Sequence, residues 1–279
     1  MLINCKRIQI ALKLIAMLAA VGFASFPAFA ATSDWASSEG GRMRVVALSP
    51  DADGTVRAGL QIEPKPGWIT YWREPGESGI PPQLTVTGDD VTLKAIAYPV
   101  PKPLMIGSIE EIGYDGPVTL PLDLKVTGPA KSAKLDLTAF IGICRDICIP
   151  FQASFTLQLP EAGKASAEEF SILNAATASL PEAPSPDFAV LGHTLSSDGK
   201  TLALRLALPD TDGPAPRIYV TGPSGYAFFR QANGERKGTN FDVDIAVGKL
   251  PKSYDIHGKS WGILVVSGNR AMETTLAFD

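Results

Sequence analysis

Two cysteines four positions apart are the residues of this chain best suited to chemistry. Cys144 and Cys148 are separated by an arginine, an aspartate and an isoleucine, and strand-like runs flank them at 135–143 and 149–159. This pattern predicts a β-hairpin whose tight turn is bracketed by two thiols. Facing positions on such a hairpin bring Cα atoms to about 4.5–5.5 Å, within the range that a disulfide requires.

The spacing leaves two purposes open for such a disulfide. As a structural staple it would be weak, because closing a loop of about five residues contributes only about 2 kcal/mol, against about 3 kcal/mol for 15 residues. As a redox pair it would be well placed, because exchange needs an accessible sulfur and a second thiol nearby. Arg145 would favour a thiolate and Asp146 would oppose it, so the charges do not decide between the two purposes.

Residues 1–30 have the pattern of a secretory signal. Basic residues precede an apolar run over 14–26, and Ala28-Phe-Ala30 supplies the small residues of a cleavage site. Cys5 lies within this segment, so two cysteines are expected in the mature protein. No later stretch approaches the roughly 20 consecutive apolar residues of a membrane helix. We therefore expect a periplasmic protein without stable membrane insertion, in a compartment where disulfides form.

Composition favours a chain of many short strands. The 279 residues include 23 Pro and 26 Gly, which break the apolar runs into short pieces. This length suits two domains of ordinary size. The net charge of −4 and the pI near 5.3 give no support for nucleic-acid binding.

The first predicted domain covers residues 36–160. It contains seven to eight short strand-like runs separated by turns, which fits an immunoglobulin-like β-sandwich. Trp68, Tyr71 and Trp72 could form a ligand platform, but aromatic residues in a strand more often fill a sandwich core. We interpret residues 101–107 as a loop, and its three consecutive apolar residues should fold over something or meet a partner.

The rest of the chain is predicted to form a connector and a second domain. Residues 161–187 hold one short helix, at 167–180, followed by a proline-rich linker. Residues 188–279 hold further strand-like runs and are predicted to form a second small β-sandwich. The fold class is therefore all-β, with the cysteine pair in the first sandwich.

The sequence lacks the common motifs of other enzyme classes. The HExxH, Walker, GxSxG and GxGxxG patterns are absent, as is a CxxC of the thioredoxin type. The two histidines, His193 and His257, lie in the second domain and show no metal-ligand spacing. A cysteine protease would need a histidine paired with Cys144 or Cys148, so their place in the other domain argues against that function. We expect no cofactor and no resident metal.

Several motifs together resemble a known family. They are Gly67-Trp-Ile-Thr-Tyr-Trp-Arg-Glu-Pro-Gly76, Gly79-Ile-Pro-Pro82, Gly113-Tyr114, Leu120-Pro-Leu122 and Cys144-Arg-Asp-Ile-Cys148-Ile-Pro150. In combination they resemble the N-terminal periplasmic domain of the thiol:disulfide interchange protein DsbD. The resemblance covers residues 36–160 and is closest to the ScsB-like (suppressor of copper sensitivity) branch, which has the same cysteine spacing and a second β-domain.

The resemblance implies a redox-active disulfide between Cys144 and Cys148 that is covered by a cap loop between encounters. By position the cap is expected at Leu104, Met105 and Ile106, where better-known members carry an aromatic residue. By positional analogy Cys148 would join the partner and Cys144 would resolve the mixed disulfide.

The resemblance also implies partners. Electrons would come from a membrane-embedded DsbD/CcdA-like donor and pass to periplasmic disulfide or thioredoxin-like proteins, as in a protein-disulfide reductase system. Full-length relatives continue into membrane and thioredoxin-like domains, and this chain ends at Asp279. A separate membrane protein is therefore the expected donor.

Two other functions stay open at this stage. One is a non-enzymatic binding or scaffold protein whose disulfide is structural. The other is a Cu(I) site for copper tolerance, formed by Cys144, Cys148 and Met105, because thiolate and thioether sulfur suit that ion.

Overall fold

The computed structural model describes residues 32–76, 78–88, 90–127, 133–161, 167–222, 229–231, 234–248 and 250–278. The expected secretory signal at 1–30 lies outside them. No helix in these ranges is long and apolar enough to cross a membrane.

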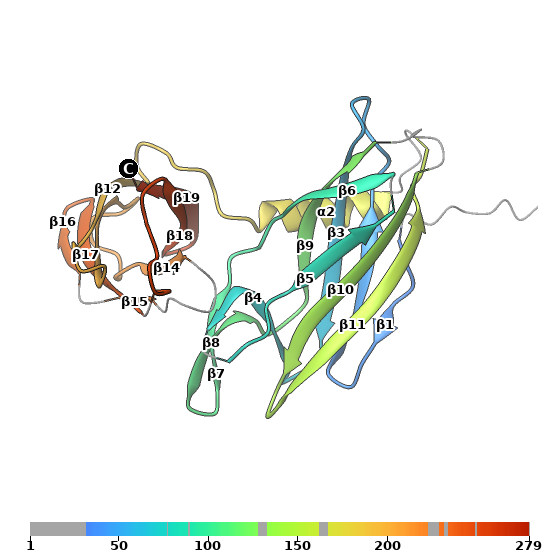
Figure 1. Ribbon diagram of the computed structural model, residues 1–279, viewed down its shortest axis with the longest axis horizontal. Helices are drawn as coiled ribbons and strands as arrows, with labels where there is room; N and C mark the ends of the chain where they lie inside the picture. Colours follow the sequence, from blue (N-terminus) through green and yellow to red (C-terminus); the bar gives the residue numbers. More distant parts are fainter. Residues whose placement is uncertain are drawn as a thin grey trace, which may run out of the picture. The chain divides into compact units, whose positions relative to one another are not determined.

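Two antiparallel sheets form the first β-sandwich (Figure 1). The first sheet has the order β1 (Ala36–Ser37), β2 (Gly41–Ala47), β3 (Thr55–Pro64), β9 (Val118–Val126) and β6 (Val91–Ile96). The second has the order β11 (Cys148–Gln158), β10 (Lys134–Cys144), β4 (Ile69–Gly76), β8 (Ile109–Tyr114) and β7 (Lys102–Ile106), with β5 (Gln83–Thr87) paired to β10.

Alternating apolar residues build the core between these sheets. Along β9 the buried positions are every second residue from Val118 to Val126, and β10 buries every second residue from Leu135 to Ile143. Side chains on a strand point alternately to its two faces, so each strand presents one apolar row to the core. The immunoglobulin-like sandwich that the sequence predicted is therefore confirmed.

A single described helix follows the first sandwich. Helix α2 (Ala167–Ala178) begins where the sequence predicts and ends two residues before the predicted Leu180. Its Leu173 is buried against Val46 and Leu48, so the helix covers the outer side of the first sheet. Figure 1 shows this helix lying across β3 and β9.

Two more antiparallel sheets form the second β-sandwich. One contains β12 (Ala189–Leu195), β13 (Thr201–Ala207), β17 (Asn240–Val247) and β15 (Phe229–Gln231), with β16 (Glu235–Lys237) also paired to β17. The other contains β14 (Arg217–Thr221), β18 (Lys259–Ser267) and β19 (Arg270–Phe278). Phe188, Phe241 and Trp261 are among the residues of its own apolar core.

One sequence prediction about local structure is wrong. Residues 101–107, predicted as a loop, contain strand β7, which pairs with β8 in a hairpin. The turn between them includes Gly107, whose φ of 61° lies in the left-handed region that glycine adopts readily. The strand tolerates Pro103 because β7 is the edge strand of its sheet.

Candidate functional site

The predicted hairpin with two bracketing cysteines is present. Strands β10 and β11 pair over their whole length, and Cys144 faces Cys148 in the last pair before the turn. The two residues form a disulfide, and their Cα atoms are 4.1 Å apart. The turn is closed by the backbone N–H of Arg145, which donates to the carbonyl of Ile147 at 3.3 Å.

The two sulfur-bearing residues differ in accessibility. Cys144 is fully buried, whereas Cys148 is partly exposed. Ile147, between them at the hairpin tip, is 70% exposed. A thiol approaching from solvent would therefore reach the disulfide from the Cys148 side.

Strand β4 positions the residues next to the disulfide. Cys144 faces Ile69 in the β10–β4 register, and the Thr70 hydroxyl donates to the Gly142 carbonyl at 2.9 Å. Alternation along β4 sends Trp68 and Trp72 into the sandwich core, as the sequence predicted. Ile69 and Tyr71 instead belong to a separate apolar cluster around the disulfide.

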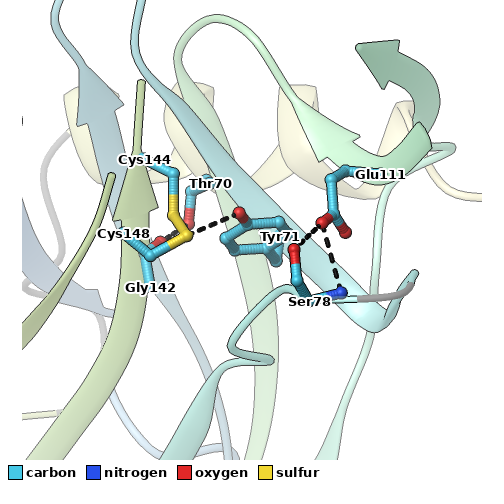
Figure 2. The surroundings of a disulfide bond; sticks show 7 residues. All are labelled: Thr70, Tyr71, Ser78, Glu111, Gly142, Cys144 and Cys148. Atoms are coloured by element: carbon cyan, nitrogen blue, oxygen red, sulfur yellow. Dashed lines mark hydrogen bonds between the residues drawn. A yellow bond between two sulfur atoms is a disulfide. The ribbon is translucent and has the colours of Figure 1, made fainter. Parts of the chain in front are cut away.

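Tyr71 contacts the disulfide directly. Figure 2 shows its hydroxyl aimed at Cys148, with an oxygen-to-sulfur distance of 3.1 Å. A disulfide sulfur carries no hydrogen, so the tyrosine O–H is the donor. Burial, with a smaller contribution from the nearby Glu111 carboxyl, raises the pKa of Tyr71 to about 12. The hydroxyl therefore stays protonated and able to donate at any physiological pH.

The β7–β8 hairpin supplies the other wall of this cluster. Leu104 and Ile106, two of the three residues expected at the cap, pack against the cluster that contains both cysteines. Met105 points elsewhere and is 63% exposed. The apolar cover thus comes from alternate residues of a strand.

The charges at the hairpin tip are paired with each other. The Arg145 Nε donates to an Asp146 carboxylate oxygen at 2.9 Å, and both side chains are exposed. The Arg145 guanidinium also lies 5.0 Å from the centre of the Trp68 ring. The positive charge that could stabilise a thiolate is therefore partly neutralised by its neighbour.

A metal ion held by His, Cys, Asp or Glu side chains needs several of them grouped together. No group of three or more such side chains within the described ranges could hold an ion. His193 contacts the Ala277 carbonyl through Nε2, and His257 contacts the Asp255 carboxylate through Nδ1, each at 2.7 Å.

Sequence reasoning missed several residues of this site. Tyr71 was interpreted as a core residue, with a ligand platform as the alternative, and Thr70, Ser78 and Glu111 were not singled out. The strand alternation carried part of the signal, because residues 69 and 71 must face away from the two tryptophans. No local sequence pattern indicated that the face of β4 with residues 69 and 71 would contact the cysteines.

Comparison with known proteins agrees with this geometry. Residues 42–160 match the family described as "Thiol:disulfide interchange protein DsbD, N-terminal". This part of the chain is therefore a domain of the DsbD N-terminal class, as the motif resemblance implied.

A solved structure extends the likeness beyond that domain. The N-terminal periplasmic domain of ScsB from Proteus mirabilis is 26% identical to this chain, with a TM-score of 0.72. The match covers 90% of this chain and 100% of that one. The predicted ScsB-like assignment is thereby confirmed. No curated protein matches the sequence.

Proposed function

We propose that the chain is a periplasmic thiol–disulfide exchange protein whose redox pair is Cys144 and Cys148. One observation carries the proposal: Cys148 is a partly exposed residue whose sulfur receives a hydrogen bond from Tyr71, and its disulfide partner Cys144 is buried beside it. A structural staple needs neither an accessible sulfur nor a donor aimed at it. The membership of residues 42–160 in the DsbD N-terminal class supports the same reading.

The difference in exposure between the two cysteine residues supports a different role for each. In the reduced protein the Cys148 thiolate attacks a partner disulfide, forming a mixed disulfide and releasing one partner thiolate. The Cys144 thiolate then attacks the Cys148 sulfur, which closes the intramolecular disulfide and releases the second partner thiolate. Two electrons have passed to the partner. The reverse sequence, begun by a donor thiolate at Cys148, reduces the pair again.

The Tyr71 hydroxyl supports both steps. A hydrogen bond from a neutral hydroxyl stabilises a thiolate at Cys148, whether that thiolate is attacking or leaving. The paired charges of Arg145 and Asp146 contribute little of this stabilisation, because each is screened by solvent and by the other.

The proposal extends to partners and location. The donor would be a membrane-embedded DsbD/CcdA-like protein, and the acceptors periplasmic disulfide or thioredoxin-like proteins. The likeness to a periplasmic domain supports this location. We also keep the predicted division into a signal at 1–30, a redox domain at 36–160, a linker at 161–187 and a second domain at 188–279.

The proposal is tested by trapping a mixed disulfide. Cys144→Ser should accumulate a covalent complex with a disulfide-bonded acceptor, because the Cys148 thiolate attacks the acceptor disulfide and no resolving thiol remains. Cys148→Ser is the matched control and should trap nothing. If both single variants exchange electrons as the parent does, the proposal is wrong.

The reduction potential separates exchange from a structural disulfide. A pair that exchanges should have a potential between about −120 and −270 mV, whereas structural disulfides lie below about −300 mV. The measurement equilibrates the protein with glutathione or dithiothreitol buffers and then alkylates the free thiols.

A further inference from the structure

A fully buried carboxyl lies near the disulfide without touching it. Glu111, on β8, has no exposed surface. Its Oε1 accepts hydrogen bonds from the Ser78 backbone N–H, at 3.2 Å, and from the Ser78 hydroxyl. Its Oε2 has no hydrogen-bond partner among the described residues. Burying a carboxyl group with one oxygen unsatisfied lowers the stability of the fold, so the presence of Glu111 at this position calls for an explanation.

The Glu111 carboxyl is also enclosed by backbone. A Cβ added to Gly76 would lie 2.7 Å from Oε2, and Gly76 has a φ of 103° that other residues rarely adopt. Glu111 is therefore held between Gly76 on one side and Ser78 on the other. We call its two hydrogen bonds with Ser78 the Glu111–Ser78 contact.

The segment that starts at Ser78 covers the Tyr71 ring. A Cβ added to Gly79 would lie 2.5 Å from ring carbons of Tyr71, so the Gly79 backbone lies directly on the ring. The next residue, Ile80, accepts a hydrogen bond from the Gly142 N–H at 3.3 Å. A Cβ added to Gly142 would lie 3.0 Å from another carbon of the same ring. The ring is thus enclosed by two glycines.

These contacts form a continuous path from Glu111 to the sulfur. Figure 2 shows the two ends of this path, where Glu111 accepts from Ser78 and the Tyr71 hydroxyl donates to Cys148. Between them Gly79, which adjoins Ser78, covers the ring. Without the Glu111–Ser78 contact the covering segment would lose its attachment to β8, and the ring would gain freedom to turn from the sulfur.

We propose that Glu111 is a positioning residue for the disulfide, which acts through Ser78 to keep the Tyr71 hydroxyl on the Cys148 sulfur. This inference rests on the proposed function for its purpose, since a donor at Cys148 matters for exchange. The positioning itself can be measured on the protein alone.

The test measures the thiol pKa of Cys148 when it is the single thiol. In the full chain carrying Cys5→Ser and Cys144→Ser, the midpoint of the pH dependence of alkylation reports that pKa. Tyr71→Phe in this background should raise the midpoint by about half a pH unit or more, because a hydrogen bond to the thiolate is lost. Glu111→Ala should also raise the midpoint, by at most the shift that Tyr71→Phe gives.

Three further variants separate positioning from general structural damage. Glu111→Gln keeps an oxygen that can accept from Ser78, so its midpoint should match the parent. Ser78→Ala removes only the hydroxyl donor and should give a smaller shift than Glu111→Ala. In a Tyr71→Phe background, Glu111→Ala should add nothing, since both changes remove the same hydrogen bond.

Two results would overturn the inference. One is an unchanged midpoint in Glu111→Ala when Tyr71→Phe shifts it, and the other is an additive effect of the two changes. If Glu111→Ala does not fold, Ser78→Ala decides, because it removes the hydroxyl that donates to Glu111 and leaves the carboxyl in place. A higher midpoint that disappears in the Tyr71→Phe background supports the inference, and an unchanged midpoint contradicts it. A failure of the proposed function would be recognised separately, because Cys144→Ser would then form no mixed disulfide with a partner protein.

Discussion

The hydroxyl of Tyr71 lies 3.1 Å from the sulfur of Cys148 and donates a hydrogen bond to it. The two residues are 77 positions apart in the chain, on β4 and at the start of β11. The pairing of β10 with β4 brings them together, because it places Ile69 opposite Cys144. Because of this contact, one of the two sulfurs of the cross-strand disulfide has its own hydrogen-bond donor.

The accessibility difference between the two cysteines predicts selective alkylation. In the reduced protein under native conditions, iodoacetamide should modify Cys148 about tenfold or more faster than Cys144, because reactivity follows exposure and thiolate character. Mass spectrometry after partial modification measures the ratio. Equal rates would contradict the roles assigned to the two residues. Unfolding in urea should abolish the difference and serves as the control.

The β7–β8 hairpin is predicted to shield the disulfide through two of its residues. Leu104→Ala and Ile106→Ala should each speed reduction by dithiothreitol several-fold, since both side chains pack against the cluster that holds the cysteines. Met105→Ala is the matched control, because Met105 is largely exposed and lies outside that cluster. A rate increase in the control as large as in the other two would argue against shielding by this face.

The ionisation of Tyr71 gives a prediction for alkaline pH. Its pKa is raised from 10.0 to about 12, mainly by burial, so the folded protein keeps it protonated where the unfolded chain begins to ionise it. The resulting stability is fully present below about pH 10 and is lost as the pH rises toward 12. The parent should therefore lose stability relative to Tyr71→Phe between these values.

Urea unfolding of the parent and of Tyr71→Phe at pH 9, 10 and 11 tests this expectation. If the difference in unfolding free energy between the parent and Tyr71→Phe stays constant over the three pH values, the folded protein does not hold the phenol in its neutral form.

Close backbone approach at Gly113 predicts a sharp loss of stability on substitution. A Cβ at Gly113 would lie 2.1 Å from the Thr70 carbonyl oxygen, within the β4–β8 pairing. Gly113→Ala should therefore cost about 1–3 kcal/mol in the free energy of unfolding, as overpacking typically does. Gly116→Ala is the control, because nothing lies within 4 Å of its added methyl group; surface changes of that kind cost about 0.5 kcal/mol or less.

Much of the fold followed from local sequence patterns. Period-two alternation and closely spaced turn residues predicted the strands of the first sandwich, and the Cys144–Cys148 spacing predicted the hairpin that carries the disulfide. Helix α2 was also predicted with its start at 167, because its apolar spacing differs from that of a strand. These features depend on residues a few positions apart, and therefore a sequence can reveal them.

Strand β7 marks the limit of such reasoning. Residues 101–107, which contain two prolines, were interpreted as a loop, although three adjacent apolar residues are unusual in one. The segment forms a strand because β8 offers it a partner and because it lies at a sheet edge, where a missing N–H costs little. Only that pairing places Leu104 and Ile106, but not Met105, against the disulfide.

By itself the sequence determined the two thiols, the hairpin between them and the all-β class. The tertiary structure decided which cysteine is partly exposed, which face of β4 meets the disulfide, and that Glu111 accepts hydrogen bonds from Ser78. The physical reason is that alternation along a strand separates two faces but does not say what lies against each. That depends on strand pairings between residues far apart in the chain, which no local pattern encodes.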